Sequence, residues 1–208
     1  MRIPEITVYS QFGQFIINFI KQNDWIKKVL EIGSGSGNGS TQCFIEGLRT
    51  KQNVNLTCVE PNEEWFLDLK ENTKNYNFIN LINKSSISYE NLLIKKYDDY
   101  WNSEYSEKDS YEYRIPWFEY DINHFKKINI GEGALETNEI YDLVLIDGSE
   151  FSGYSEYLLI KDRTKCIMLD DVNVFKCKQI NKELKNSKNW KLIAEGNERN
   201  GWSCFIKI

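Results

Sequence analysis

The chain has 208 residues, of which 41% are hydrophobic and 27% are charged, and this balance excludes a disordered chain and a fibrous protein. Its 26 basic and 31 acidic side chains give a formal net charge of −5, which makes it a poor candidate for wrapping nucleic acid. No stretch approaches the ~20 apolar residues of a membrane-spanning helix. We therefore expect neither a nucleic-acid partner nor a membrane partner.

Helical and extended patterns alternate along most of the chain. Apolar residues spaced three and four apart predict helices, and short continuous apolar runs predict buried strands. The predicted helices cover 10–23, 40–48, 63–72, 154–160 and 175–185, and the predicted strands cover 25–32, 55–60, 78–82, 141–147, 165–170, 190–195 and 202–208. This alternation predicts an α/β fold with a doubly wound, mostly parallel sheet of seven strands, whose last two strands form an antiparallel hairpin.

The five cysteines and the N-terminal residues favour a cytoplasmic location. The cysteines are scattered, odd in number and form no CxxC pair, so neither a disulfide framework nor a zinc site is expected. Residues 1–11 lack the long apolar stretch of a signal peptide. We expect reduced thiols in a cytoplasmic protein.

A glycine-rich turn, EIGSGSGNGS over residues 31–40, joins the first predicted strand to a helix. Glycines let a ligand approach the main chain closely, and the following helix offers free N–H groups. Glu60 ends the second predicted strand, 23 residues after Gly37. An acid at about this distance from a glycine turn is placed to accept hydrogen bonds from ribose hydroxyls. These features predict a cofactor that contains adenosine. They do not by themselves distinguish NAD from other cofactors of this kind.

Three further features separate the alternatives. The turn reads Gly-x-Gly-x-Gly, Glu31 lies two residues before its first glycine, and the chain ends in a predicted hairpin. With these features the sequence resembles the class I S-adenosylmethionine-dependent methyltransferases. The matching stretches are VLEIGSGSGNGS (29–40), TCVEPN (57–62), YDLVLIDGS (141–149) and CIMLDD (166–171). The subfamily stays open between FkbM-like enzymes and metal-dependent O-methyltransferases.

The resemblance implies a single methyltransferase domain over 1–208 with a Rossmann-like fold, and it assigns cofactor-binding residues. The turn residues Gly33, Ser34, Gly35 and Gly37, with Glu31 behind them, would hold the methionine half of S-adenosylmethionine. Glu60, with Pro61 beside it, would bind the ribose, and Ser85 and Ser86 would flank the adenine. The implied reaction is O-methylation of a small molecule or a sugar. An NAD-dependent oxidoreductase and a non-catalytic Rossmann-like binding module are the alternatives.

Three carboxylates stand at the ends of two neighbouring predicted strands. Asp147 follows one strand, and Asp170 and Asp171 end the next. Because ligands bind beyond the carboxyl ends of parallel strands, these side chains should face one crevice. Carboxylate oxygens suit a hard cation such as Mg²⁺, and catechol-type methyltransferases hold a metal with acids at these positions. The alternative is that Asp147 contacts cofactor or substrate directly and Asp170 or Asp171 caps the next helix.

The methyl donor is already activated as a sulfonium, so the protein's main task is to align it with the acceptor. A neutral hydroxyl acceptor additionally needs a base or a metal. His124, the only histidine, and Asp147 are the two candidate catalytic bases.

The resemblance does not cover residues 89–140, a connection about three times longer than an ordinary helical one. Within it, residues 97–121 hold eight acidic and two basic side chains and nine of the 29 aromatic residues. We expect this acidic aromatic insertion, with an ordered anchor at 115–118, to form a lid that binds the acceptor. The alternative is an interface between copies of the chain in a homo-oligomer.

Overall fold

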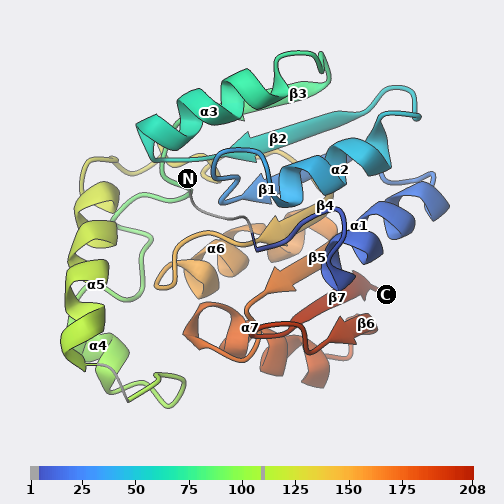
Figure 1. Cartoon of the computed structure of the whole chain (residues 1–208). Coiled ribbons are helices and arrows are strands. Elements are labelled where there is room, and N and C mark those ends of the chain that lie inside the picture. Colours follow the sequence, from blue (N-terminus) through green and yellow to red (C-terminus); the bar gives the residue numbers. More distant parts are fainter. Residues whose placement is uncertain (1–4, 109–110) are drawn as a thin grey trace.

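The computed structural model of the chain describes residues 5–108 and 111–208 (Figure 1). Its sheet has seven strands in the order β3-β2-β1-β4-β5-β7-β6. The strands are β1 Lys28–Ile32, β2 Asn55–Val59, β3 Ile79–Ile82, β4 Tyr141–Ile146, β5 Thr164–Asp170, β6 Trp190–Gly196 and β7 Trp202–Lys207. The five strands β1 to β5 are parallel to one another, whereas β7 runs antiparallel to both β5 and β6. The predicted doubly wound, mostly parallel sheet with a C-terminal antiparallel hairpin is confirmed.

Helices cover both faces of this sheet. They are α1 Gln11–Gln22, α2 Ser40–Leu48, α3 Glu63–Thr73, α4 Tyr97–Trp101, α5 Tyr111–Phe125, α6 Gly153–Ile160 and α7 Phe175–Asn186, with a short 3₁₀ turn η1 at Lys161–Arg163. One apolar cluster packs α1, α2 and α3 on one face, and a second packs α4 to α7 on the other. Among the described residues, no helix combines the length and apolar character needed to cross a bilayer.

The first strand is shorter than predicted. It begins at Lys28 rather than Trp25, because the amide of Ile26 donates to the carbonyl of Asn23 in a turn. Its side chains then alternate between the two faces, as a strand requires. Leu30 and Ile32 belong to the cluster under α4 to α7, whereas Glu31 points to the opposite face, where α2 begins.

The sheet order reverses beside β1. The chain passes from β1 to β2 and β3 on one side and then returns to β4 on the other. The amide of Asp147 donates to the carbonyl of Ile32 at 3.1 Å, so the ends of β4 and β1 lie together. In open α/β sheets, ligands bind in the crevice at such a reversal, beyond the carboxyl ends of the strands.

The long insertion carries two helices, α4 and α5, with residues 109–110 outside the described part. Aromatic contacts hold these helices to the loop before α6. The ring centroid of Phe151 lies 5.3 Å from that of Tyr100 on α4 and 5.0 Å from that of Phe118 on α5. Phe118 is buried and serves as the anchor expected at 115–118, whereas Trp117 is exposed. In Figure 1, α5 stands on the side toward which β1 and β2 point.

Candidate functional site

A cavity of about 760 Å³ opens at the carboxyl ends of β1, β2, β4 and β5. Its wall combines the 33–40 turn, residues 60–62, residues 85–86, one face of α5 and the loops after β4 and β5. We call the part built by the turn, Glu60 and Ser86 the turn half. The part built by Asp147, Asp171 and Lys176 is the strand-end half.

The backbone of the turn half depends on two glycines. Gly33 has φ +87°, and a Cβ added there would stand 2.2 Å from the carbonyl oxygen of Asp147. Gly35 has φ +54° with open space beside it, and its N–H donates to Oε2 of Glu60 at 2.8 Å. The turn therefore presses against β4 at Gly33 and exposes main chain to the cavity at Gly35.

Glu60 is almost fully buried at the end of β2 and accepts two backbone hydrogen bonds. Its Oε2 accepts from Gly35, and its Oε1 accepts from the amide of Asn62 at 2.8 Å. Burial raises the pKa of Glu60 to about 7, although the two N–H donors act in the opposite direction. The carboxylate is thus fixed in direction, faces the cavity beside Pro61, and titrates near neutral pH.

Glu31 lies behind the turn, as predicted, and does not line the cavity. Ser40 donates to its Oε1 at 2.6 Å and Thr41 donates to its Oε2 at 2.7 Å. Burial raises its pKa, and these hydroxyl donors partly offset that effect. Glu31 therefore fixes the start of α2 against the end of β1.

The wall next to Ser86 contains a buried acid that the sequence reasoning missed. Oε1 of Glu156, on α6, accepts from Ser86 at 2.5 Å and from Ser152 at 2.7 Å. Its Oε2 is buried and has no hydrogen-bond partner among the described residues. Burial raises the pKa of Glu156. A lone acid among the apolar residues of GYSEYLLI was the available signal.

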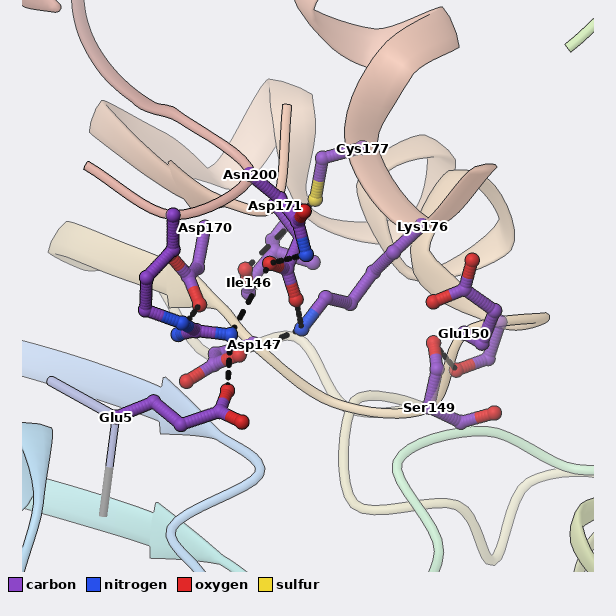
Figure 2. A network of polar contacts seen from close by, with 12 residues as sticks. Glu5, Ile146, Asp147, Ser149, Glu150, Asp170, Asp171, Lys176, Cys177 and Asn200 are labelled. Atoms are coloured by element: carbon purple, nitrogen blue, oxygen red, sulfur yellow. Dashed lines mark hydrogen bonds and ion pairs between the residues drawn. The ribbon is translucent and has the colours of Figure 1, made fainter. Parts of the chain in front are cut away.

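The strand-end half brings the three predicted carboxylates together, and their ligand atoms all lie within 4.8 Å of one another. Sequence reasoning missed the cation between them. The Nζ of Lys176, on the first turn of α7, lies 2.7 Å from Oδ1 of Asp147 and 2.6 Å from Oδ2 of Asp171. Figure 2 shows this side chain reaching between the two acids. Asp170 is buried off the cavity wall, with the nearest guanidinium nitrogen of Arg199 at 3.5 Å.

The charges in this half depend on one another. Burial raises the pKa of Asp147. Burial and the negative charge of Asp147 together raise the pKa of Asp170 to about 8. Burial also opposes ionisation of Asp171, but the charge and hydrogen bond of Lys176, the hydrogen bond from Asn200 and the charge of Arg199 together outweigh it and hold the pKa of Asp171 below its ordinary value. Burial alone would lower the pKa of Lys176, yet the three carboxylates hold it well above its ordinary value. Lys176 is therefore an ammonium at neutral pH.

Helix α5 covers the cavity with one face. The residues on this face recur at helical spacing and line the wall: Arg114, Trp117, Tyr120, Asp121, His124 and Phe125. The hydroxyl of Tyr120 accepts from the side chain of Asn62 at 3.0 Å, which ties α5 to the turn half. Asp121, which sequence reasoning did not single out, accepts from Ser149, and burial raises its pKa.

His124 lies on the cavity wall, as do Asp147 and Asp171. Its Nδ1 is 3.0 Å from the carbonyl oxygen of Tyr120, so this nitrogen donates within the helix and Nε2 is the free acceptor. Of the predicted site residues, one group shares this cavity: Gly33, Ser34, Gly35, Glu60, Pro61, Ser85, Ser86, His124, Asp147 and Asp171. Glu31, Gly37 and Asp170 stand behind it, and a Cβ at Gly37 would meet Leu69 of α3 at 2.7 Å.

The sheet order, the glycine turn and the acid after β2 together define a Rossmann-like methyltransferase fold. A candidate caffeoyl-CoA O-methyltransferase from Staphylococcus aureus is 16% identical and superposes with a TM-score of 0.61 over 98% of this chain and 87% of its own. An O-methyltransferase from Bacillus cereus, in complex with SAH (S-adenosylhomocysteine), is 12% identical, with a TM-score of 0.58 over 99% and 84%.

A third solved structure is the O-methyltransferase TomG from Streptomyces achromogenes, involved in tomaymycin synthesis and in complex with SAM (S-adenosylmethionine). It is 9% identical to this chain, with a TM-score of 0.59 over 99% of this chain and 83% of its own. No protein-family model matches the sequence, and no curated protein matches it. At these identities the likeness is one of fold.

Proposed function

We propose that the chain is a SAM-dependent methyltransferase that transfers a methyl group to a hydroxyl oxygen of a small molecule or a sugar. One observation carries the proposal: the glycine turn, bonded to Glu60, lines the same cavity as Asp147 and Asp171 at the strand ends. Its volume of about 760 Å³ is within the range typical of small-molecule sites, roughly 300–1,000 Å³.

The turn half suits the cofactor. Gly33, Ser34 and Gly35 would hold the methionine portion, with Glu31 fixing the helix behind them. Glu60 would accept hydrogen bonds from the ribose hydroxyls beside Pro61. The adenine would lie toward Ser85, Ser86 and Glu156, where the unpaired Oε2 of Glu156 supplies an acceptor.

The strand-end half suits the acceptor. When bound, SAM supplies a methyl group on a positively charged sulfur, so the protein's main task is alignment. Asp147 would take the proton of the acceptor hydroxyl as the acceptor oxygen bonds to the methyl carbon. The carbon–sulfur bond would break at the same time, and its electron pair would stay on sulfur. The raised pKa of Asp147 suits a general base, and Nε2 of His124 is the second candidate.

The predicted Mg²⁺ does not fit this arrangement while Lys176 is in place. Mg²⁺ requires ligand oxygens at about 2.1 Å in octahedral geometry. The oxygens of Asp147 and Asp171 that would bind it already hold the ammonium of Lys176, and a nitrogen of Arg199 lies 3.6 Å from Asp171. A divalent cation would meet two fixed positive charges, so the proposed reaction uses no metal.

We further propose that the chain is one methyltransferase domain in which the insertion is an acceptor-binding lid rather than an oligomer interface. The lining face of α5 supports this assignment. Its indole and phenol rings at Trp117 and Tyr120, next to Asp121, suit a polyol or a sugar.

The test is a turnover assay that follows SAH release from SAM against a panel of sugars, phenols and other hydroxyl compounds. The proposal expects at least one acceptor to be methylated on oxygen, with SAH released in equal amount. Methylation confined to nitrogen or carbon acceptors, or none with SAM bound, would contradict it.

A further inference from the structure

Lys176 is an unusual residue for the wall of a ligand cavity. Its side chain is only 8% exposed, although it carries a full positive charge. A buried ammonium is stable only when it is paired and hydrogen-bonded, and removing one partner of a buried pair is strongly destabilising. The helix α7 places this charge between the ends of β4 and β5, at the level of Asp147 and Asp171 (Figure 2).

The ammonium is only partly satisfied by the protein. It has three N–H donors. One bond goes to Oδ1 of Asp147 at 2.7 Å, and a second goes to Oδ2 of Asp171 at 2.6 Å. Among the described residues, no protein atom accepts a bond from the third donor, and Lys176 is on the cavity wall. The third N–H is therefore available to a ligand oxygen.

The surroundings resemble a metal site in their charges. Three carboxylates gather within 4.8 Å, which is a donor set for a hard cation. Lys176 stands between two of them, and Arg199 lies near the outer oxygens of Asp170 and Asp171 at 3.5 and 3.6 Å. The side chain of Asn200 donates to Asp171 at 3.0 Å, so both oxygens of that acid are engaged.

We propose that Lys176 is a built-in cation that takes the place of a divalent metal in this cavity. Its ammonium holds Asp147 and Asp171 and donates its third N–H to the acceptor oxygen. This inference rests on the proposed methyl transfer. In the step, the acceptor oxygen bonds to the methyl carbon, the carbon–sulfur electron pair leaves with sulfur, and the hydroxyl proton goes to Asp147. Lys176 keeps its own proton and stabilises the acceptor oxygen while that oxygen loses its hydroxyl proton.

Direct metal binding tests the proposal without any assay of turnover. Mn²⁺ is titrated into the wild type, Lys176→Ala and Lys178→Ala, and free Mn²⁺ is followed by electron paramagnetic resonance. Lys178 is the matched control, because it is an exposed lysine on the same helix. We expect one Mn²⁺ to bind Lys176→Ala at least about a hundredfold more tightly than either other protein, since three carboxylates then lose their internal cation.

Two results would overturn the proposal. One is a tight Mn²⁺ site in the wild type that disappears in Asp171→Asn. The other is equal, weak binding by the wild type and by folded Lys176→Ala. If Lys176→Ala does not fold, Lys176→Ser provides a second small variant, and the wild-type titration still applies.

Once an acceptor is found, turnover provides a second test. We expect EDTA to leave the wild-type rate unchanged and Lys176→Ala to lose about a hundredfold in kcat, as removal of one oxyanion donor does. SAH affinity should change less than threefold, added Mn²⁺ should restore part of the rate, and Lys176→Arg should retain more activity than Lys176→Ala. Loss of wild-type turnover in EDTA would overturn the proposal. Failure to find any acceptor would count against the proposed function, while the Mn²⁺ titrations would still decide the role of Lys176.

Discussion

The two halves of the cavity are built in different ways. The turn half uses the backbone N–H groups of Gly35 and Asn62 around one carboxylate, Glu60, with Ser86 and Glu156 beside them. The strand-end half uses charged side chains from separate segments, and its central pair, Asp147 and Lys176, is separated by 29 residues. The first is held mainly by backbone N–H groups, whereas the second is a network of ion pairs between side chains. Backbone geometry should therefore control cofactor affinity, and charge should control the chemical step.

The largest effect is expected at Asp147. We expect Asp147→Asn to lower kcat by about 10²–10⁴-fold, the usual contribution of a general base, because the amide cannot take the acceptor's proton. SAH affinity should stay close to that of the wild type, since the turn half is untouched. Steady-state rates and calorimetry measure the two quantities. Asp162→Asn, at an exposed acid on η1, is the control, and a large loss of SAH affinity in Asp147→Asn would break the separation of the halves.

A backbone change comes next. Gly33→Ala forces a side chain into φ +87° and within 2.2 Å of the Asp147 carbonyl, so we expect a loss of about 3 kcal/mol in the free energy of unfolding. Gly131→Ala is the matched control, because Gly131 has φ +83° with open space around it and should lose only about 1–2 kcal/mol. Denaturant unfolding gives both values. Equal losses would show that the contact between the turn and β4 contributes nothing.

A smaller, pH-dependent effect is expected at Glu60. In the proposed cofactor complex, ribose hydroxyls would donate to the ionised carboxylate of Glu60. Its pKa of about 7 means that most of it is protonated at pH 6 and ionised at pH 8. SAH should therefore bind about tenfold more tightly at pH 8 than at pH 6, and binding should release a proton.

Glu60→Gln should abolish this pH dependence and weaken SAH binding at pH 8 by about tenfold or more. Glu63→Gln, at an exposed acid on α3, should leave both unchanged. Calorimetry in buffers of different ionisation enthalpy measures affinity and proton release together. Affinity that falls as pH rises would contradict the role assigned to Glu60.

The smallest effect concerns the contact between α5 and the turn half. Tyr120→Phe removes the hydrogen bond to Asn62, which is worth about 1 kcal/mol at most on an exposed surface. We expect a change of two- to fivefold in the KM for the acceptor and little change in kcat. Tyr9→Phe, at an exposed tyrosine near the N-terminus, is the control. A loss of kcat as large as that of Asp147→Asn would place Tyr120 in the chemistry itself.

Sequence reasoning reached the sheet, its hairpin and the turn half, because strands and glycine turns are set by local patterns. It also brought Asp147 and Asp171 to one edge, because parallel strands share the direction of their ends. It missed Lys176 and Glu156, since a lysine or glutamate on a predicted helix is ordinarily solvated and only the packing of α6 and α7 shows that both are buried. The path of the insertion likewise depends on long-range aromatic contacts made by Phe118.

The turn half should bind SAM or its product SAH rather than NAD. The most direct test is calorimetry of the full chain with SAH and, separately, with NAD, using Glu60→Gln as the matched variant. We predict one SAH bound per chain with micromolar affinity, at least about tenfold weaker binding by Glu60→Gln at pH 8, and no measurable heat from NAD. Binding of NAD in preference to SAH, or SAH binding that Glu60→Gln leaves unchanged, would contradict it.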